Sequence, residues 1–511
     1  MITRLYSAAL RGVDAQEVEV EVNARGADKP LIVIVGLPDT SVKESSQRVI
    51  SAIGASALFL DDGVKTVNLA PADLKKEGPS FDLPIALAMV GACGTKLFEA
   101  EDCCVVGELG LDGAVRPVKG VLAVALEAKR RGRHRVIVPE ANAAEAAVVA
   151  DIQVIPVRNL KQAWDFLNGD VVIPPFHLDR RAFFASRRRY EVDFDEVRGQ
   201  HHVKRALEVA AAGAHNLLMV GPPGTGKSML AKRIPTIMPD MSEEEAIDTT
   251  KIHSITGVLD AQRGFLTTRP FRAPHHTISD AGLLGGGSNP GPGEVSLAHH
   301  GVLFLDELPE FRRSTLEVMR QPLEDGHVTI SRAAGSLTFP SRFMLVAAMN
   351  PCPCGYYGDP KRECRCSSRQ IEQYRQRISG PLLDRIDLHI EVPLVDFREL
   401  SAATPSGEPS GSIRERVIEA RAIQQERFRK SSNTTNAGMG SRQVRLHCQL
   451  DAESNRYLEH AMEEMNFSAR AHDRILKVAR TLADLAGSDY IRANDILEAI
   501  QYRALDRKLM V

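Results

Sequence analysis

Aromatic side chains, excess charge and long apolar runs are all scarce in this 511-residue sequence. Aromatic residues make up 5% of the chain, with one tryptophan, which disfavours an extended platform for stacking nucleic-acid bases. The formal net charge is −2, so any basic binding surface must be local. The longest apolar run, near residues 83–93, is much shorter than the ~20 residues that a membrane-spanning helix needs.

We also expect no secretory signal, because the first residues show no basic segment followed by an apolar core. We therefore expect a cytoplasmic protein with no membrane partner. Its eight cysteines are then expected as reduced thiols or metal ligands rather than as disulfides. The length predicts two to four domains, since a single hydrophobic core stops growing well below this size.

Strand and helix patterns divide the chain into four segments and predict a multidomain α/β protein. Residues 1–170 mix strands with helices, and residues 171–192 form a linker. Residues 193–395 form a second α/β block, and residues 396–511 are helical.

Three local patterns within these segments lead to specific expectations. The continuous apolar run at 31–35 predicts a buried strand. Residues 40–53 predict a helix with a Thr or Ser cap. The linker cluster Arg187-Arg188-Arg189 is either a solvated face or a patch that contacts phosphates.

A phosphate-binding loop follows the apolar strand that ends at residue 220. The pattern is G-x-x-x-x-G-K-S, and a helical segment begins at once after it. Its glycines let the backbone N–H groups point at phosphate oxygens, and the helix N-terminus adds positive potential. Lys227 is expected to reach the β- and γ-phosphates, and Ser228 to bind Mg²⁺. The expected ATP-binding residues are Gly221, Pro222, Pro223, Gly224, Thr225, Gly226, Lys227 and Ser228.

An acidic pair, Asp306-Glu307, ends a second apolar strand. We expect Asp306 to hold Mg²⁺, directly or through water, and Glu307 to act as general base on the attacking water. Asn350 ends the apolar strand 344–349 and is assigned as the polar sensor that orients this water. The alternatives are a solvated turn for the acidic pair and a turn-starting Asn before proline for Asn350.

Together these motifs resemble AAA+ ATPases of the magnesium-chelatase-like branch, and within it the competence protein ComM, or YifB-type, family. The resemblance covers nearly the whole chain. The strings that carry it are Gly36-Leu37-Pro38-Asp39-Thr40, the lead-in Val197-Arg198-Gly199-Gln200, Arg272-Ala273-Pro274-His275-His276, residues 292–301, and Asn350-Pro351-Cys352-Pro353-Cys354-Gly355.

The resemblance implies a hexameric ring with ATP bound between subunits. Arg385 matches the position of an arginine finger, which stabilises charge on the phosphoryl group bound by the neighbouring subunit. Arg470 matches the second sensor on a helical lid. Each arginine could instead serve a structural ion pair.

Two hairpins are expected in insertions of the 193–395 block, and the resemblance implies that the first points into the ring pore. Lys227 and Asp306 are 79 positions apart, whereas a simple βαβ crossover takes roughly 30 residues. The Gly- and Pro-rich stretch 283–294 is the first candidate. Residues 328–339 form the second, with Arg332 near the tip. The hairpins either grip DNA phosphates or pack between subunits, and the flanking histidine pairs are expected to brace loops rather than bind metal.

Half of the eight cysteines lie within fifteen positions, at Cys352, Cys354, Cys364 and Cys366. Four thiolates can bind Zn²⁺ tetrahedrally and staple a loop. The C-x-C spacing departs from the usual C-x₂₋₄-C, so free thiols in a tight loop remain the alternative. Nearby Lys361, Arg362, Arg365 and Arg369 make the loop a candidate DNA-facing element.

The N-terminal block resembles the Lon protease domain of the ribosomal-protein-S5-like superfamily through Glu77-Gly78-Pro79-Ser80 and residues 107–118. Ser80 stands at the nucleophile position. Leu122 stands where the resemblance requires a lysine base, and a serine hydroxyl without a base is a poor nucleophile. We therefore expect a Lon-like α+β scaffold without proteolytic activity, followed by an AAA+ core and a helical lid.

The leading functional hypothesis is an ATP-driven DNA motor with ATP and Mg²⁺ as cofactors. The resemblance implies a ring helicase that promotes branch migration during natural transformation. The alternatives are a chelatase-like protein-remodelling ATPase, an ATP-dependent protease, and a nucleotide-gated DNA-binding scaffold.

Overall fold

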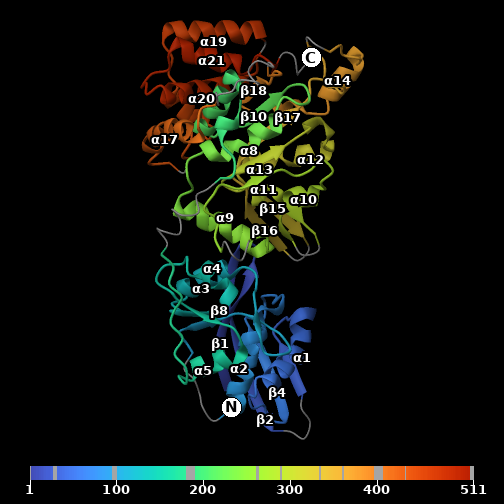
Figure 1. Cartoon of the computed structure of the whole chain (residues 1–511), viewed down its shortest axis with the longest axis vertical. Coiled ribbons are helices and arrows are strands. Elements are labelled where there is room, and N and C mark those ends of the chain that lie inside the picture. The colour runs from blue at the N-terminus through green and yellow to red at the C-terminus, as the bar shows by residue number, and fades with distance from the viewer. Residues whose placement is uncertain are drawn as a thin grey trace. The chain divides into compact units, whose positions relative to one another are not determined.

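The computed structural model describes residues 2–26, 31–94, 100–179, 190–259, 264–287, 290–332, 335–359, 362–395, 407–431, 433–465 and 467–506. It divides into two compact units, one of Met1–Arg188 with Ser242–Thr267 and one of Arg189–Met241 with Thr268–Val511 (Figure 1). In these ranges, no helix combines the length and the apolar character needed to cross a bilayer.

The first unit is built on a seven-stranded sheet of order β3-β4-β2-β1-β5-β8-β9. β1, β2 and β4 pair antiparallel, whereas β1-β5-β8-β9 and β3-β4 pair parallel. The strands are β1 (Ile2–Arg11), β2 (Asp14–Gly26), β3 (Leu31–Val35), β4 (Gly63–Ala70), β5 (Cys103–Val105), β8 (Arg135–Pro139) and β9 (Gln153–Val157), and a separate pair joins β6 (Glu108–Leu109) to β7 (Val115–Arg116).

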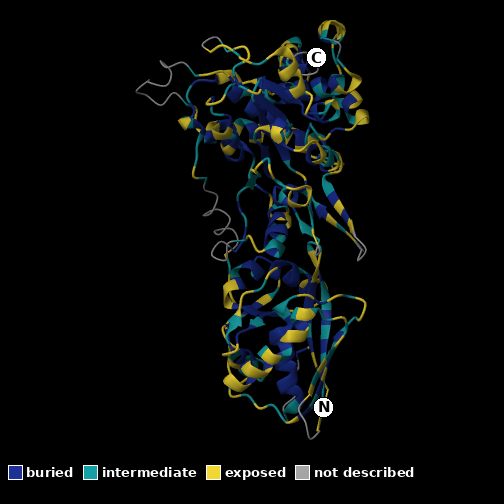
Figure 2. Ribbon diagram, turned by 90° about the vertical axis from the view of Figure 1, so that its right-hand side faces the viewer, coloured by how far each residue is buried: buried dark blue, intermediate teal, exposed yellow. Residues whose placement is uncertain are grey.

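Two central helices, α2 and α3, pack on β1 and β2 of this sheet. α2 is apolar on every side and buried from Asp82 to Ala92, which explains the long apolar run in its sequence (Figure 2). The helices of the unit are α1 (Thr40–Ala55), α2 (Asp82–Cys93), α3 (Val121–Arg130), α4 (Ala143–Ala146), α5 (Leu160–Leu167) and α9 (Glu243–Thr256).

Two sequence predictions in this unit are wrong in detail. β3 was expected to be buried, but it lies at the edge of the described sheet beside β4, and its side chains alternate between exposed and half-buried. The predicted helix at 40–53 is confirmed as α1, but its cap is Asp39, whose carboxylate accepts a hydrogen bond from Val42 N–H at 2.8 Å. A carboxylate suits this position because it satisfies a free N–H group and favours the positive end of the helix dipole.

The segment Ser242–Thr267, which contains α9, belongs to the first unit, although the residues before and after it in the chain belong to the second. Gly120 N–H donates to Ser254 Oγ at 2.9 Å, and Lys251 Nζ lies 2.6 Å from Asp14 Oδ1. Ser254 also donates to the buried carboxylate of Glu145, which accepts from Leu122 N–H at 2.8 Å. The sequence had assigned this segment to the 193–395 block, because no local pattern marks its packing partner.

The second unit contains an all-parallel five-stranded sheet of order β11-β14-β17-β10-β18. Its central strands are buried along their whole length, as their continuous apolar runs require. The strands are β11 (Phe271–Arg272), β14 (Val302–Leu305), β17 (Met344–Met349), β10 (Leu217–Val220) and β18 (Leu388–Glu391).

Short helices and two hairpins fill the connections of this sheet. β15 pairs antiparallel with β16 from His327↔Pro340 to Arg332↔Gly335, which confirms the predicted second hairpin. The first insertion is a minimal hairpin, β12 with β13, between two short helices. The elements are α7 (His201–Gly213), α8 (Lys227–Ile237), α10 (Asp280–Leu284), β12 (Gly285–Gly286), β13 (Gly291–Pro292), α11 (Glu294–Leu297), α12 (Arg313–Val318), α13 (Arg320–Asp325), β15 (His327–Arg332), β16 (Gly335–Pro340), α14 (Ser368–Arg375) and α15 (Gly380–Leu383).

The C-terminal region is helical and shares one hydrophobic core with the sheet of the second unit. Buried His215 links the two parts, because Nδ1 lies 2.9 Å from Asp387 Oδ2 and Nε2 lies 2.8 Å from Thr481 Oγ1. The predicted multidomain α/β architecture with a helical C-terminus is confirmed. The helices are α17 (Ser410–Arg427), α18 (Ser441–His447), α19 (Ala452–Met465), α20 (Ala469–Leu485) and α21 (Ala493–Gln501).

Candidate nucleotide site

The phosphate-loop motif forms the tight turn between β10 and α8 that its sequence predicts. Gly224 and Gly226 both have φ of +83°, a left-handed conformation that favours glycine. A Cβ on Gly221 would lie 2.2 Å from the Val392 carbonyl oxygen, so this position admits no side chain. The turn leads into the N-terminus of an 11-residue helix, where free N–H groups and the helix dipole favour an anion.

Lys227 is the first residue of α8, and its side chain folds back over the loop. Its Nζ donates to the carbonyl oxygens of Gly221 at 2.7 Å and Pro222 at 2.9 Å, and to Asn350 Oδ1 at 3.3 Å. Burial lowers the pKa of Lys227, whereas the nearby carboxylates of Asp306 and Glu307 act in the opposite direction. The ammonium group therefore lies between the loop and the carboxyl ends of β14 and β17.

The acidic pair lies beside the phosphate loop because β14 and β10 are both parallel neighbours of β17. Ser228 Oγ donates to Asp306 Oδ2 at 2.7 Å. These two oxygens are hard ligands of the kind that Mg²⁺ prefers. The site thus provides a hydroxyl and a carboxylate that can bind Mg²⁺ next to the phosphate loop.

Glu307 is turned out of the strand direction by a left-handed backbone, with φ of +53°. Its N–H donates to Asp306 Oδ1 at 2.9 Å, which fixes the turn. Its carboxylate is half-exposed, and Oε2 lies 3.1 Å from His276 Nδ1. A solvent-reaching carboxylate held beside Asp306 is suited to accept a proton from water.

Sequence reasoning missed two residues that support the site. His276 was expected only to brace a loop, but it contacts Glu307 directly. Gln200 has no predicted contact, yet its side-chain amide donates to the carbonyl oxygens of Thr225 at 3.0 Å and Pro393 at 2.9 Å. The Arg-Ala-Pro-His-His string was the available signal for His276, but its partner 31 positions away could not be read from it.

The two predicted arginines each form an ion pair with a carboxylate of their own chain. Arg385 is 7% exposed and forms an ion pair with Glu324. Arg470, at the start of α20, is exposed, and its Nη1 lies 3.8 Å from Asp384 Oδ2. Within this chain, Arg385 therefore makes the structural ion pair that the sequence left open as its alternative.

The four cysteines converge on one point. Cys352 Sγ lies 3.4 Å from Cys354 Sγ and 3.7 Å from Cys364 Sγ, and all four sulfurs lie within 4.8 Å of one another. Backbone N–H groups of Tyr356 and Arg365 point at Cys354 and lower the pKa of its thiol to about 6. This arrangement can hold a thiophilic metal ion.

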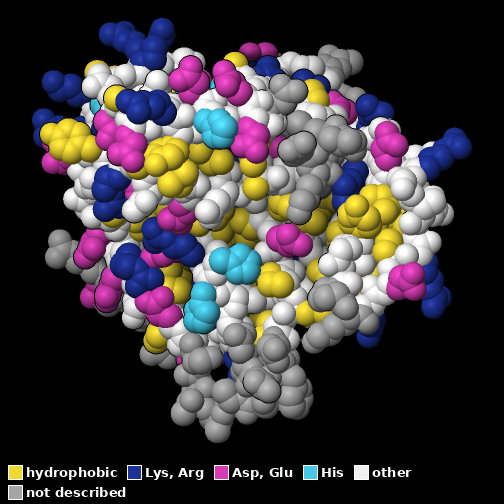
Figure 3. All heavy atoms as spheres, turned by 90° about the horizontal axis from the view of Figure 1, so that it is seen from above, with side chains coloured by type: hydrophobic (Ala, Val, Ile, Leu, Met, Phe, Trp, Pro, Cys, Tyr) yellow, Lys and Arg dark blue, Asp and Glu magenta, His cyan; other side chains and the backbone are white. Residues whose placement is uncertain are grey.

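The predicted DNA-contacting side chains are only partly described. The side chain of Arg332, the cluster Arg187–Arg189 and Lys361 lie outside the described residues. The β15–β16 hairpin instead presents exposed cross-strand hydroxyl pairs, Thr329 with Thr338 at 3.0 Å and Ser331 with Ser336 at 2.8 Å. On the face in Figure 3, basic and acidic side chains are interspersed, as the small net charge leads one to expect.

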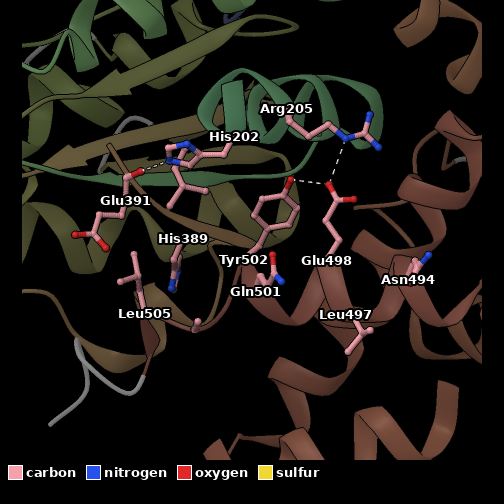
Figure 4. A pocket seen from close by; sticks show the side chains of 12 residues that line it. His202, Arg205, His389, Glu391, Asn494, Leu497, Glu498, Gln501, Tyr502 and Leu505 are labelled. Carbon is pink, nitrogen blue, oxygen red and sulfur yellow. Dashed lines mark hydrogen bonds and ion pairs between the residues drawn. The ribbon is translucent and has the colours of Figure 1, made fainter. Parts of the chain in front are cut away.

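A cavity of about 730 Å³ lies in the second unit, beside β18 and α21 (Figure 4). His202 reaches the Glu391 carbonyl oxygen at 2.9 Å on one side, and Tyr502 donates to Glu498 at 2.8 Å on the other. Its lining comes from α7, β18 and α21 and from neighbouring residues, and includes neither the acidic pair nor the phosphate-binding residues.

In the first unit, Leu122, which the sequence resemblance to Lon proteases aligns with the expected lysine, is fully buried. Ser80 lies at the short turn before α2, and its carbonyl oxygen accepts from Gly107 N–H at 3.0 Å. Among the described contacts, no basic side chain is bonded to the Ser80 hydroxyl.

Comparison with protein families gives three matches that together span most of the chain. Residues 193–400 match the family described as magnesium chelatase, subunit ChlI. Residues 18–142 match subunit ChlI of Mg-chelatase, and residues 407–503 match the ChlI C-terminal family.

Individual relatives agree with these matches. The uncharacterised protein YifB of Escherichia coli is 44% identical, covering 99% of this chain and 98% of the relative. The competence protein ComM of Haemophilus influenzae is also 44% identical, with the same coverage of 99% and 98%. The magnesium-chelatase 38 kDa subunit of Cereibacter sphaeroides is 25% identical over 31% of this chain and 52% of its own.

Proposed function

The chain belongs to the YifB and ComM type of magnesium-chelatase-like proteins, and from this premise we propose that it is an ATP-driven DNA motor of the AAA+ class. The observation that carries the proposal is the meeting of the phosphate loop with the acidic pair through Ser228 and Asp306. The cofactors are ATP and Mg²⁺, with Zn²⁺ as a structural ion at the four-cysteine cluster.

Each residue of the site has a proposed task in hydrolysis. Residues 221–228 cradle the phosphates, and Lys227 moves from the loop carbonyls to the β- and γ-phosphates. Ser228 and Asp306 would hold Mg²⁺, and the bound ion would supply positive charge next to the phosphate oxygens. Glu307 accepts the proton of the attacking water, and Asn350 orients that water.

We extend this to a hexameric ring in which Arg385 acts on the ATP of the neighbouring subunit and Arg470 reports on bound nucleotide. The membership of the family supports the ring, since AAA+ sites of this kind lie between subunits. Arg385 must leave Glu324 to reach a neighbour. The pair can then serve as a resting position for the finger.

Branch migration of DNA in the cytoplasm, in support of natural transformation, is the proposed biological task. The name of the competence protein ComM supports it, because that relative aligns with 99% of this chain. The exposed hydroxyl pairs on β15–β16 supply donors for phosphate contacts without base specificity.

The decisive experiment measures ATP hydrolysis by the full chain with and without single-stranded and forked DNA at low salt, followed by strand separation on the fork. Stimulation by DNA and separation of the strands are the expected results. ATP hydrolysis that DNA leaves unchanged, with no DNA binding, would favour the alternative of a chelatase-like protein-remodelling ATPase.

For the domains, we propose boundaries at 1–170, 171–192, 193–395 and 396–511, with the first segment a Lon-like scaffold without proteolysis. Leu122 in place of a lysine supports this, because Ser80 then lacks a base. Casein cleavage that disappears in Ser80→Ala would overturn it and revive an ATP-dependent protease.

A further inference from the structure

The four-cysteine cluster is joined directly to the nucleotide site, because only Pro351 separates Cys352 from Asn350. We propose that the cluster binds one Zn²⁺ ion and that this ion holds residues 350–355 against the phosphate loop. The zinc site is then a structural part of the ATPase centre. The inference rests on the proposed ATPase function and assigns to the cluster a task within it.

The sulfur geometry fits a tetrahedral zinc ion. Four sulfurs at the usual Zn–S distance of about 2.3 Å lie about 3.8 Å from one another. Cys352, Cys354 and Cys364 have sulfur–sulfur separations of 3.4, 3.6 and 3.7 Å, and Cys366 completes the set within 4.8 Å. Cys352 is fully buried, so the cluster has an inner wall of protein and an outer side that an ion can enter.

The segment 350–355, which we call the brace, contacts the nucleotide site in two places. The first is at Gly355, the residue after Cys354. A Cβ on Gly355 would lie 2.6 Å from Pro223 Cδ and 3.9 Å from Asn350 Cγ. The backbone of the cysteine loop therefore rests on the phosphate loop and next to the proposed sensor. Gly355 also has φ of +87°, so both its backbone and its lack of a side chain are needed there.

The second contact of the brace is made by Asn350 and Pro351, which directly follow β17. Asn350 Oδ1 accepts from Lys227 at 3.3 Å, and the Pro351 carbonyl oxygen accepts from Arg375 Nη2 at 3.3 Å. Fixing Cys352 and Cys354 to an ion fixes the residues on either side of them. Metal ligation thus sets the position of Asn350 and Pro223 together, as supporting contacts do around other catalytic groups.

Loss of zinc is expected to lower turnover more than it lowers nucleotide affinity. The phosphate loop keeps its backbone N–H groups and Lys227, but Asn350 is no longer held. Displacement of an orienting group by about 1 Å costs roughly 10- to 100-fold in rate.

The test uses the purified full chain and three variants. Zinc is measured by elemental analysis, and Co²⁺ is added as a spectroscopic probe of a tetrahedral thiolate site. Wild type is expected to hold one zinc ion per chain. Cys364→Ser should lose the zinc and the Co²⁺ spectrum, and its ATP turnover should fall by roughly 10- to 100-fold.

Gly355→Ala separates the metal from the brace, because it keeps all four cysteines and places a methyl group against Pro223. It should retain zinc and still lose turnover by a similar factor. Cys93→Ser is the matched control, because Cys93 lies in the first unit, where its thiol bonds Asp61. This substitution should change neither the zinc content nor the turnover.

Zinc-free wild type with no Co²⁺ spectrum would overturn the metal site, and full turnover in Gly355→Ala would overturn the brace. Zinc content, the Co²⁺ spectrum and binding of a fluorescent ATP analogue need no hydrolysis. A wild-type chain that holds zinc but hydrolyses no ATP would therefore contradict the proposed function and leave the metal site standing.

Discussion

Ser228 Oγ donates a hydrogen bond to Asp306 Oδ2 across 2.7 Å, although 78 positions separate the two residues. The bond exists because β14 and β10 both pair with β17, so that their carboxyl ends open on the same edge of the sheet. Ligands at this edge bind where loops of different strands meet. The contact is therefore the geometric basis for a shared magnesium ion.

The first prediction concerns this pair. Ser228→Ala and Asp306→Asn should each lower ATP turnover by roughly 10- to 100-fold and raise the Mg²⁺ concentration needed for half-maximal rate. The double variant should lose far less than the product of the two single effects, because both residues act through one ion. Titration of turnover against Mg²⁺ in the four proteins checks this, and strictly multiplicative losses would count against a shared ion.

The second prediction concerns the contact between His276 and Glu307. His276→Ala should lower kcat by roughly 10-fold with little change in KM. The substitution removes the contact that positions Glu307, the proposed general base, and leaves the phosphate loop unchanged. His275→Ala is the matched control. Its ring neighbours His276 but its Nδ1 bonds Thr277, so turnover should stay near wild type. Equal losses in both variants would show that the histidine pair acts only through loop packing.

The third prediction asks whether Arg385 acts on a neighbouring subunit. Arg385→Ala should bind ATP but hydrolyse it about 1,000-fold more slowly, whereas Glu324→Gln should remain close to wild type. Mixing Arg385→Ala with Lys227→Ala chains should restore part of the turnover, because one supplies the phosphate loop and the other the arginine. A mixture as inactive as its components would confine Arg385 to its ion pair with Glu324.

The fourth prediction follows from buried His299, whose Nδ1 accepts a hydrogen bond from Arg342 N–H at 2.9 Å. Burial lowers the pKa of His299 to about 2. Below a pH of about 6.5 the unfolded chain binds a proton that the folded chain rejects, so stability falls as pH falls from about 6.5 towards about 2.

From about pH 7.5 to about pH 5.5, this group alone should lower the free energy of unfolding by about 1.4 kcal/mol. His299→Asn keeps an acceptor but does not titrate. Its unfolding transition should therefore lose less stability than wild type over the same interval. Parallel pH profiles for the two proteins would show that His299 titrates normally in the folded chain.

The features that could be predicted from the sequence are motifs whose chemistry depends on residues close together in the chain. The phosphate loop, the acidic pair and the strand before Asn350 could be predicted because each is a short strand followed by residues of defined chemistry. The β15–β16 hairpin followed from alternation on both sides of a turn. The family strings then linked these separate motifs into one protein.

What the sequence could not provide are contacts set by tertiary packing. The bond between His276 and Glu307, the ion pair of Arg385 with Glu324, and the packing of α9 against α3 join residues far apart in the chain. The exposure of β3 was misjudged because an apolar run has the same pattern at a sheet edge and at its centre.

The most direct test compares ATP binding and hydrolysis by wild type, Lys227→Ala and Glu307→Gln. We predict that wild type turns over ATP and that Lys227→Ala loses most of its nucleotide affinity. Glu307→Gln should bind ATP nearly as wild type does but hydrolyse it at least about 100-fold more slowly. A wild-type chain that neither binds nor cleaves ATP, or a Glu307→Gln variant with normal turnover, would contradict the account.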